Sequence, residues 1–203
     1  MSAIKLLGLN IISMKVISYN VRSWTRGNDW KERFADIKRL LEVVSPDIIL
    51  LQEADPPFGG KIIPDGYKRA THGVSHFILV RDGIKVKRSA FGIFYDWCDI
   101  DDMRVINVHS RWEDKIISDT MKKVCNLMTY KTIVGGDFNV GVSKIQSLNV
   151  GYNLKVIGED TFQNWSKPES HGEIDHFLLH GLDGDVYIAS HEKLSDHYPI
   201  YLK

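Results

Sequence analysis

The sequence predicts a single mixed α/β domain in which buried strands alternate with amphipathic helices. Short apolar runs that suit strands recur along the chain, for example at residues 16–19, 48–51 and 103–108. Between them, residues 30–44 and 112–128 carry apolar side chains three and four positions apart, as on one face of a helix. With 203 residues, 43% of them hydrophobic, the chain is long enough for one sizeable core and too short for two.

Local signals define the elements of the first half. Asp29 and Glu32 resemble a capping box at the start of the first helix, and Pro46 ends it. The run at 48–51 is apolar without alternation, as in a strand covered on both faces. Prolines and glycines make residues 54–66 a loop. A hairpin meander with a turn at Asp82-Gly83 is expected from three strand-like pieces, residues 76–80, 84–86 and 91–95.

The second half continues the alternation of strands and helices. A strand at 103–108 leads into the second helix and then into a short apolar strand that ends in Gly135-Gly136. Residues 142–148 are expected to form a short helix, and residues 159–173 an irregular loop that carries aromatic side chains. The remaining predicted strands are residues 154–157, 174–179 and 185–189.

The charge of the chain limits its partners. Its 26 basic and 26 acidic residues leave a formal net charge of zero. Proteins that wrap long duplex DNA usually carry a basic excess, because neutralisation of phosphates dominates their affinity. Any contact with nucleic acid is therefore expected to be local or brief.

Residues 1–14 are expected to be an N-terminal extension and residues 15–203 the single domain. The extension shows no cleavage-site pattern, so no signal peptide is predicted, and translation starts at either Met1 or Met14. No apolar run is long enough to cross a bilayer, and we expect a cytoplasmic monomer. Cys98 and Cys125 form either one disulfide or two free thiols, and buried free thiols are favoured.

The segment Gly135-Gly136-Asp137-Phe138-Asn139 carries the clearest candidate chemistry. Its glycines let the backbone turn sharply, so that Asp137 and Asn139 emerge together at the carboxyl end of a strand. A carboxylate there can bind a hard cation or take a proton from water, and an amide can orient that water. Taken alone, the pattern fits a polar turn equally well, because Gly, Asp and Asn dominate turns.

Comparable polar residues stand at the ends of the other strand-like runs. One such residue is easily a loop residue, but a set that repeats at strand after strand favours a site. The set consists of Asn20, Glu53, His109, Asp175, Asp196 and His197.

Six motifs in order make the chain resemble the endonuclease/exonuclease/phosphatase superfamily, over about residues 15–202. They are Ser18-Tyr19-Asn20-Val21, Leu51-Gln52-Glu53, Ile106-Asn107-Val108-His109, Gly136-Asp137-Phe138-Asn139, Ile174-Asp175-His176 and Ser195-Asp196-His197-Tyr198-Pro199. The resemblance implies two packed, mostly antiparallel β-sheets in a four-layer α/β sandwich of the deoxyribonuclease type, with the site at one end.

The resemblance also implies metal-dependent hydrolysis of a phosphate ester. Glu53 and Asp196, helped by the amide of Asn20, would hold a hard divalent cation, magnesium with manganese as a substitute. Asp137 would activate or orient the attacking water, with Asn139 beside it.

Two histidines complete the implied site. His197, held by Asp175, would stabilise charge on the phosphate oxygens. His109 would contact a phosphate oxygen or protonate the leaving group. The deoxyribonuclease branch pairs this histidine with a glutamate on the preceding hairpin, and residues 66–81 contain no acidic partner of this kind. We therefore expect His109 to act as a hydrogen-bond donor, and His76 to lie at the surface or in a hairpin.

Three residues are candidates for contacting the substrate. Arg22 stands where the deoxyribonuclease branch also carries an arginine, and Arg111 follows His109 closely. Trp165 lies in the loop before Asp175, where recognition and simple loop packing are both open. Trp112 suits base stacking, but we favour a core contact of the following helix.

The sequence therefore predicts a magnesium-dependent phosphodiesterase, with a nuclease acting on DNA or RNA as the leading hypothesis. A hydrolase of a small nucleotide, phosphoinositide or phospholipid is the alternative within enzymes, and the neutral charge and the short chain favour it somewhat. A catalytically inactive binding module is kept because a fold does not guarantee its function.

Overall fold

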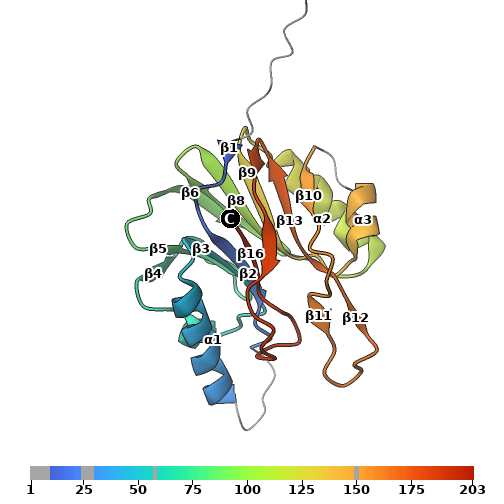
Figure 1. Cartoon of the computed structure of the whole chain (residues 1–203). Coiled ribbons are helices and arrows are strands. Elements are labelled where there is room, and N and C mark those ends of the chain that lie inside the picture. The colour runs from blue at the N-terminus through green and yellow to red at the C-terminus, as the bar shows by residue number, and fades with distance from the viewer. Residues whose placement is uncertain (1–9, 24–29, 57–58, 149–150) are drawn as a thin grey trace, which may run out of the picture.

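The computed structural model describes residues 10–23, 30–56, 59–148 and 151–203. Two six-stranded sheets form its centre (Figure 1). The first sheet has the order β15 (Val186–Ile188), β16 (Ile200–Leu202), β2 (Val16–Asn20), β3 (Ile48–Gln52), β5 (Phe77–Arg81) and β4 (Tyr67–Arg69). The second has the order β10 (Asn153–Lys155), β13 (Asp175–His180), β9 (Thr132–Asp137), β8 (Met103–His109), β7 (Tyr95–Ile100) and β6 (Val86–Phe91).

Each of the two sheets contains one pair of parallel strands at its centre. β2 runs parallel to β3, and β8 runs parallel to β9, whereas all other neighbours in the two sheets are antiparallel. Parallel neighbours need a crossover connection. Helix α1 (Trp30–Val44) lies between β2 and β3 in the chain, and helix α2 (Asp114–Asn126) lies between β8 and β9. The short helix α3 (Val142–Leu148) follows β9.

Three apolar clusters hold four layers together. Both sheets contribute to the central cluster, for example through Leu50 and Phe177. On the outer face of the first sheet, α1 packs through Phe34 and its neighbours. On the outer face of the second sheet, α2 and α3 pack through residues such as Met121. The layers are therefore helix, sheet, sheet and helices, and the predicted two-sheet α/β sandwich is confirmed.

The connection between β5 and β6 differs from the predicted hairpin. The sequence predicts a hairpin over residues 76–86, but β5 and β6 belong to different sheets. The turn at Asp82-Gly83, where Gly83 has a φ of 93°, carries the chain from one sheet to the other. β6 pairs only with β7 among the described strands and is mostly exposed, so it lacks the apolar alternation that identifies a half-buried strand.

Smaller elements complete the described chain. β1 (Asn10–Ile11) pairs with β14 (Leu182–Asp183), and a 3₁₀ turn spans Gly59–Ile62. The predicted loop at 159–173 contains two short strands, β11 (Phe162–Gln163) and β12 (His171–Gly172), which project below the sheets in Figure 1. Asp29 and residues 1–9 of the expected extension lie outside the described residues. Cys98 is buried and Cys125 partly buried, both as free thiols. Among the described residues, no helix is long and apolar enough to cross a membrane.

Candidate active site

The carboxyl ends of the two parallel strand pairs bring the candidate residues together. Asn20 ends β2, and Glu53 directly follows β3. His109 and Asp137 end β8 and β9, and the sheet register sets them side by side. Asp175 opens the antiparallel strand β13 opposite Asp137. The ends of the four parallel strands and the start of the antiparallel strand β13 therefore bring all five side chains to the same end of the sandwich.

The backbone at these strand ends takes conformations that L-residues seldom adopt. Glu53 and Asn139 have positive φ angles of 49° and 56°, in the left-handed region. Gly136 has a φ of 149°, and a Cβ atom there would lie 2.0 Å from the carbonyl oxygen of Val108. Only glycine fits so close to the neighbouring strand. The glycine before Asp137 is thus required for β8 and β9 to approach each other at the site.

Hydrogen bonds from two amides hold the carboxylate of Asp137. Asn20 Nδ2 donates to Asp137 Oδ2 at 2.9 Å and to Glu53 Oε1 at 3.0 Å. The backbone N–H of Asn139 donates to Asp137 Oδ1 at 2.8 Å, and its Nδ2 donates to Oδ2 at 3.2 Å and to the carbonyl of Ser110 at 3.0 Å. Asp137 is only 1% exposed, so these donors replace the water that it loses on folding.

His197 also lies beside Asp137, in addition to Asn20 and Asn139. Its Nδ1 is 2.9 Å from Asp175 Oδ2, and its Nε2 is 3.7 Å from Asp137 Oδ2. Burial lowers the pKa of His197, but the carboxylates of Asp175 and Asp137 outweigh it and raise the pKa to about 10. Burial raises the pKa of Asp137 to about 6, against the opposing effect of His197. At neutral pH the site therefore holds an imidazolium beside an ionised carboxylate of increased basicity.

Two groups of side chains could hold a cation. Ligand atoms of Glu53, His109 and Asp137 lie within 4.8 Å of one another, and so do those of Asp137, Asp175 and His197. The first group fits a hard cation such as magnesium, because it offers carboxylate oxygens at a partly open position. The second is fully buried and already joined by the hydrogen bond between His197 and Asp175.

Asp196, predicted to be a metal ligand, belongs to neither group and instead forms an ion pair with Arg22. The guanidinium of Arg22 lies 5.3 Å from the ring centroid of Trp165, and that of Arg33 lies 5.9 Å from it. Arg33 also donates to the carbonyls of Val21, Arg22 and Leu194 at 3.1 Å each. The sequence does not single out Arg33, because its acceptors come from segments far apart in the chain.

A buried pair behind His109 has no signal in the sequence. The ring of His76 lies edge-on to that of His109, with centroids 6.2 Å apart, and His76 Nε2 is 3.5 Å from Asp96 Oδ1. Burial lowers the pKa of His76 to about 4 and raises that of Asp96 to about 7. The expected surface position of His76 is wrong, since His76 is only 4% exposed, whereas the expected hairpin position holds, because His76 lies directly before β5 in the connection between the antiparallel strands β4 and β5. Asp96 lies in β7, outside residues 66–81, the segment in which the family resemblance would place an acidic partner for His109.

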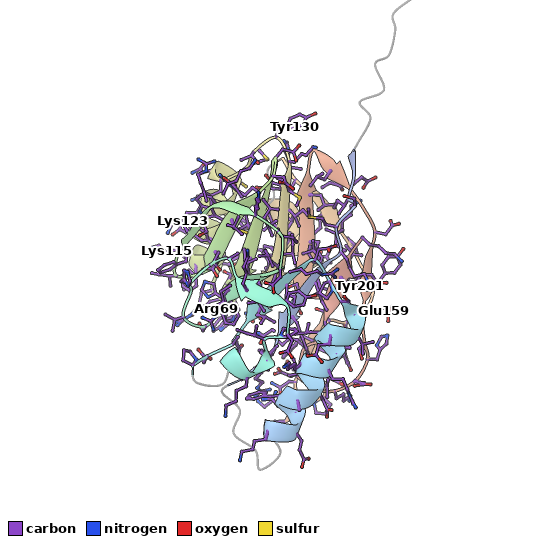
Figure 2. The ribbon with its side chains drawn as sticks, turned by 90° about the vertical axis from the view of Figure 1, so that its left-hand side faces the viewer. Arg69, Lys115, Lys123, Tyr130, Glu159 and Tyr201 are labelled. Carbon is purple, nitrogen blue, oxygen red and sulfur yellow. The ribbon has the colours of Figure 1, made fainter. Side chains whose placement is uncertain are left out.

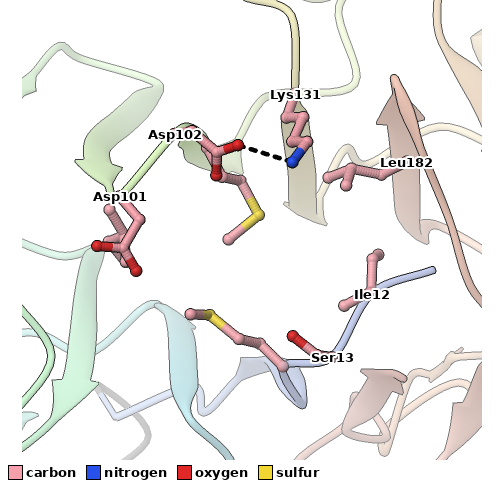
Figure 3. Close-up of a pocket in the computed structure, with 9 residues that line it drawn as sticks. Ile12, Ser13, Asp101, Asp102, Lys131 and Leu182 are labelled. Atoms are coloured by element: carbon pink, nitrogen blue, oxygen red, sulfur yellow. Dashed lines mark hydrogen bonds and ion pairs between the residues drawn. The ribbon is translucent and has the colours of Figure 1, made fainter. Parts of the chain in front are cut away.

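Arg111 and Trp112 border a hollow beside the site. The hollow holds about 340 Å³ and is lined by His109, Asn139 and Ile93 as well. Trp112 is 72% exposed and precedes α2, so the predicted core contact is wrong. A second hollow of about 260 Å³ lies at the opposite end of the sheets, beside the ion pair of Lys131 with Asp102 (Figure 3). It contains none of the candidate residues.

Solved structures share this fold over nearly the whole chain. TDP2 from D. rerio, in complex with a single-strand DNA product, matches with a TM-score of 0.70 and 16% identity, over 93% of this chain and 97% of the other. The 3′ phosphatase NExo from Neisseria, bound to a product DNA hairpin, matches with a TM-score of 0.68 and 17% identity, over 94% of this chain and 99% of the other. Beta toxin from Staphylococcus aureus matches with a TM-score of 0.75 and 16% identity, over 94% and 99%. These matches confirm the deoxyribonuclease-like fold.

Sequence comparisons identify the family. No curated protein sequence matches the chain. The family model described as "Endonuclease/Exonuclease/phosphatase family" matches residues 17–197, which include every candidate site residue from Asn20 to His197. The chain therefore belongs to the endonuclease/exonuclease/phosphatase family.

Proposed function

We propose that this protein is a magnesium-dependent hydrolase of phosphodiester bonds and that its substrate is nucleic acid, DNA or RNA. The observation that carries the proposal is the environment of Asp137. It is a buried carboxylate held by two amides, with Glu53 on one side and the imidazolium of His197 on the other. The Oδ2 atom of Asp137 accepts a hydrogen bond from Asn20 and also lies 3.7 Å from His197 Nε2. A carboxylate with a merely structural role would not need a cationic histidine so close.

Asp137 and His197 have different roles in the proposed reaction. Asp137, oriented by Asn20 and Asn139, accepts the proton of the attacking water, and its raised pKa makes it a better base near neutral pH. His197, held by Asp175, donates a hydrogen bond to a phosphate oxygen as charge develops there.

Magnesium, or manganese in its place, would supply Lewis-acid stabilisation of the phosphate. Glu53, positioned by the hydrogen bond from the Asn20 amide, would hold it, and Asp196 would join Glu53 only on leaving its ion pair with Arg22. Arg22, now paired with Asp196, would contact a phosphate oxygen. His109 is near enough to Glu53, 3.7 Å from its Oε1, to donate to the same phosphate or to the leaving oxygen.

Two of the structures with this fold support nucleic acid as the substrate class, since they were solved with a DNA product. The net charge of zero favours a second candidate, a small phosphodiester, because long polyanions are usually bound by a basic excess. A salt titration separates the two: the KM for a polymer rises steeply with salt, whereas the KM for a small diester changes little.

The decisive experiment measures hydrolysis of labelled DNA, RNA and bis(4-nitrophenyl) phosphate by the purified protein with magnesium or manganese. Asp137→Asn should lower kcat by about 10²- to 10⁴-fold, because it keeps the shape and removes the base. Asp102→Asn, the same change at the opposite end of the sheets, should leave the rate unaltered. If the wild type hydrolyses none of the three, or if both variants behave alike, the proposal fails and an inactive binding module becomes the better explanation.

A further inference from the structure

Exposed apolar side chains gather on one side of the candidate active site. Val74, Phe91, Ile93 and Trp112 are 70%, 60%, 81% and 72% exposed. They line two adjoining hollows, of about 480 and 340 Å³, which share Ser75 and Ile93. We call these four residues the apolar shelf. They come from three segments far apart in the sequence, so their proximity is a property of the fold.

The apolar shelf is continuous with the catalytic groups. The hollow that Trp112 borders is also lined by His109 and Asn139, and by the exposed side chain of Arg111. A substrate with its phosphate at His109 would therefore lay the neighbouring group on the shelf. That group must be largely apolar, because it covers Trp112, Ile93 and Phe91.

A nucleobase has the chemistry that fits this position. Its flat apolar face stacks on aromatic side chains, and its phosphate suits an adjacent arginine. With a net charge of zero the chain offers no basic excess to bind a polyanion, so stacking must supply much of the affinity. Within a duplex the faces of each base are covered by the bases above and below. A base inside a duplex therefore cannot lie on the shelf, whereas an unpaired base can.

We propose that the apolar shelf binds an unpaired nucleobase next to the scissile phosphate, so that the enzyme acts on single-stranded nucleic acid or on frayed ends. This inference rests on the proposed function and narrows its substrate class. It also explains why Trp112 is held at the surface beside His109 and not in the core.

The test compares a thymidine oligomer with an oligomer of abasic spacers that has the same number of phosphates. Trp112→Ala should lower kcat/KM on the thymidine oligomer by about 5- to 150-fold, the range expected for one stacked base, and should not change it on the abasic oligomer. Trp112→Phe should restore most of the loss. Tyr130→Ala removes an equally exposed aromatic at the opposite end of the molecule (Figure 2) and should change neither rate.

Several outcomes would overturn the inference. One is an equal loss on both oligomers, and another is a wild type that does not distinguish them. A third is binding to phosphatidylcholine vesicles that Ile93→Asp abolishes, which would assign the shelf to a lipid surface. A binding assay separates the shelf from the hydrolase, because binding of the two oligomers to Asp137→Asn, measured by fluorescence anisotropy, does not depend on turnover. If the variant prefers the thymidine oligomer but the wild type hydrolyses nothing, the shelf is upheld and the hydrolase is refuted. If the wild type hydrolyses both oligomers and the variant shows no preference, the hydrolase is upheld and the shelf is refuted.

Discussion

The buried pair of His197 with Asp175 should make the stability of the protein depend on pH in a defined window. His197 has its pKa raised from 6.5 to about 10, because Asp175 and Asp137 outweigh the effect of burial. A group whose pKa is raised on folding contributes stability that is fully present below the unfolded pKa and is lost as the pH rises through the folded one. The free energy of unfolding should therefore fall between about pH 6.5 and pH 10.

The pKa shift of His197 sets how much the free energy of unfolding can change over this pH range. One pKa unit corresponds to about 1.4 kcal/mol, so the full shift of His197 corresponds to about 5 kcal/mol as an upper bound. Asp175→Asn removes the carboxylate that lies 2.9 Å from His197 Nδ1 and should abolish most of this pH dependence. Because it also breaks a buried pair, the variant should be about 3–5 kcal/mol less stable than the wild type near pH 7.

The assay is urea denaturation at several pH values between about 6 and 10, with the imidazole of His197 followed by NMR. Asp36→Asn changes a carboxylate of the exposed pair with Arg39 and serves as the matched control. It should keep the slope of the wild type. Equal slopes for the wild type and Asp175→Asn, or a His197 that titrates near its ordinary pKa of 6.5, would refute the assignment of charge in the site.

Two further results are expected. In calorimetric titrations with magnesium, Glu53→Gln should weaken binding strongly, whereas Asp137→Asn should abolish turnover and largely spare the metal; if Asp137→Asn loses the metal as well, Asp137 is a ligand and not only the base. Gly136→Ala should destabilise the protein by about 2 kcal/mol or more in thermal unfolding, because its Cβ atom would lie 2.0 Å from the carbonyl oxygen of Val108, whereas Gly60→Ala, with nothing within 4 Å, should have little effect; equal stabilities would contradict the close approach of β8 and β9.

The strand ends are predictable because each carries a local signal. An apolar run followed by a polar residue marks the end of a buried strand, and this pattern alone locates Asn20, Glu53, His109 and Asp137. The helix predicted at residues 142–148 has the same bounds as α3. The family resemblance adds the two-sheet sandwich, which strand counting does not establish.

Other features depend on contacts that local patterns do not record. The turn at Asp82-Gly83 has the sequence of a hairpin, but sheet membership is decided by which strands find partners, and β6 pairs with β7. Trp112 has the spacing of a core residue, yet α2 begins after it and leaves it exposed. Asp96 is distant from His76 in the sequence and meets it only because β7 packs against β5.

The signals for strand ends and turns lie in neighbouring residues, so the amino-acid sequence is enough to identify the side chains that can do chemistry and to place them at the ends of strands. How these side chains combine is known only from the fold. It joined Asp137 to Asn20 across 117 positions of the chain, set Asp196 against Arg22, and assembled the apolar shelf from three separate segments. Such contacts depend on the packing of the two sheets on each other, and that packing is a property of the whole core.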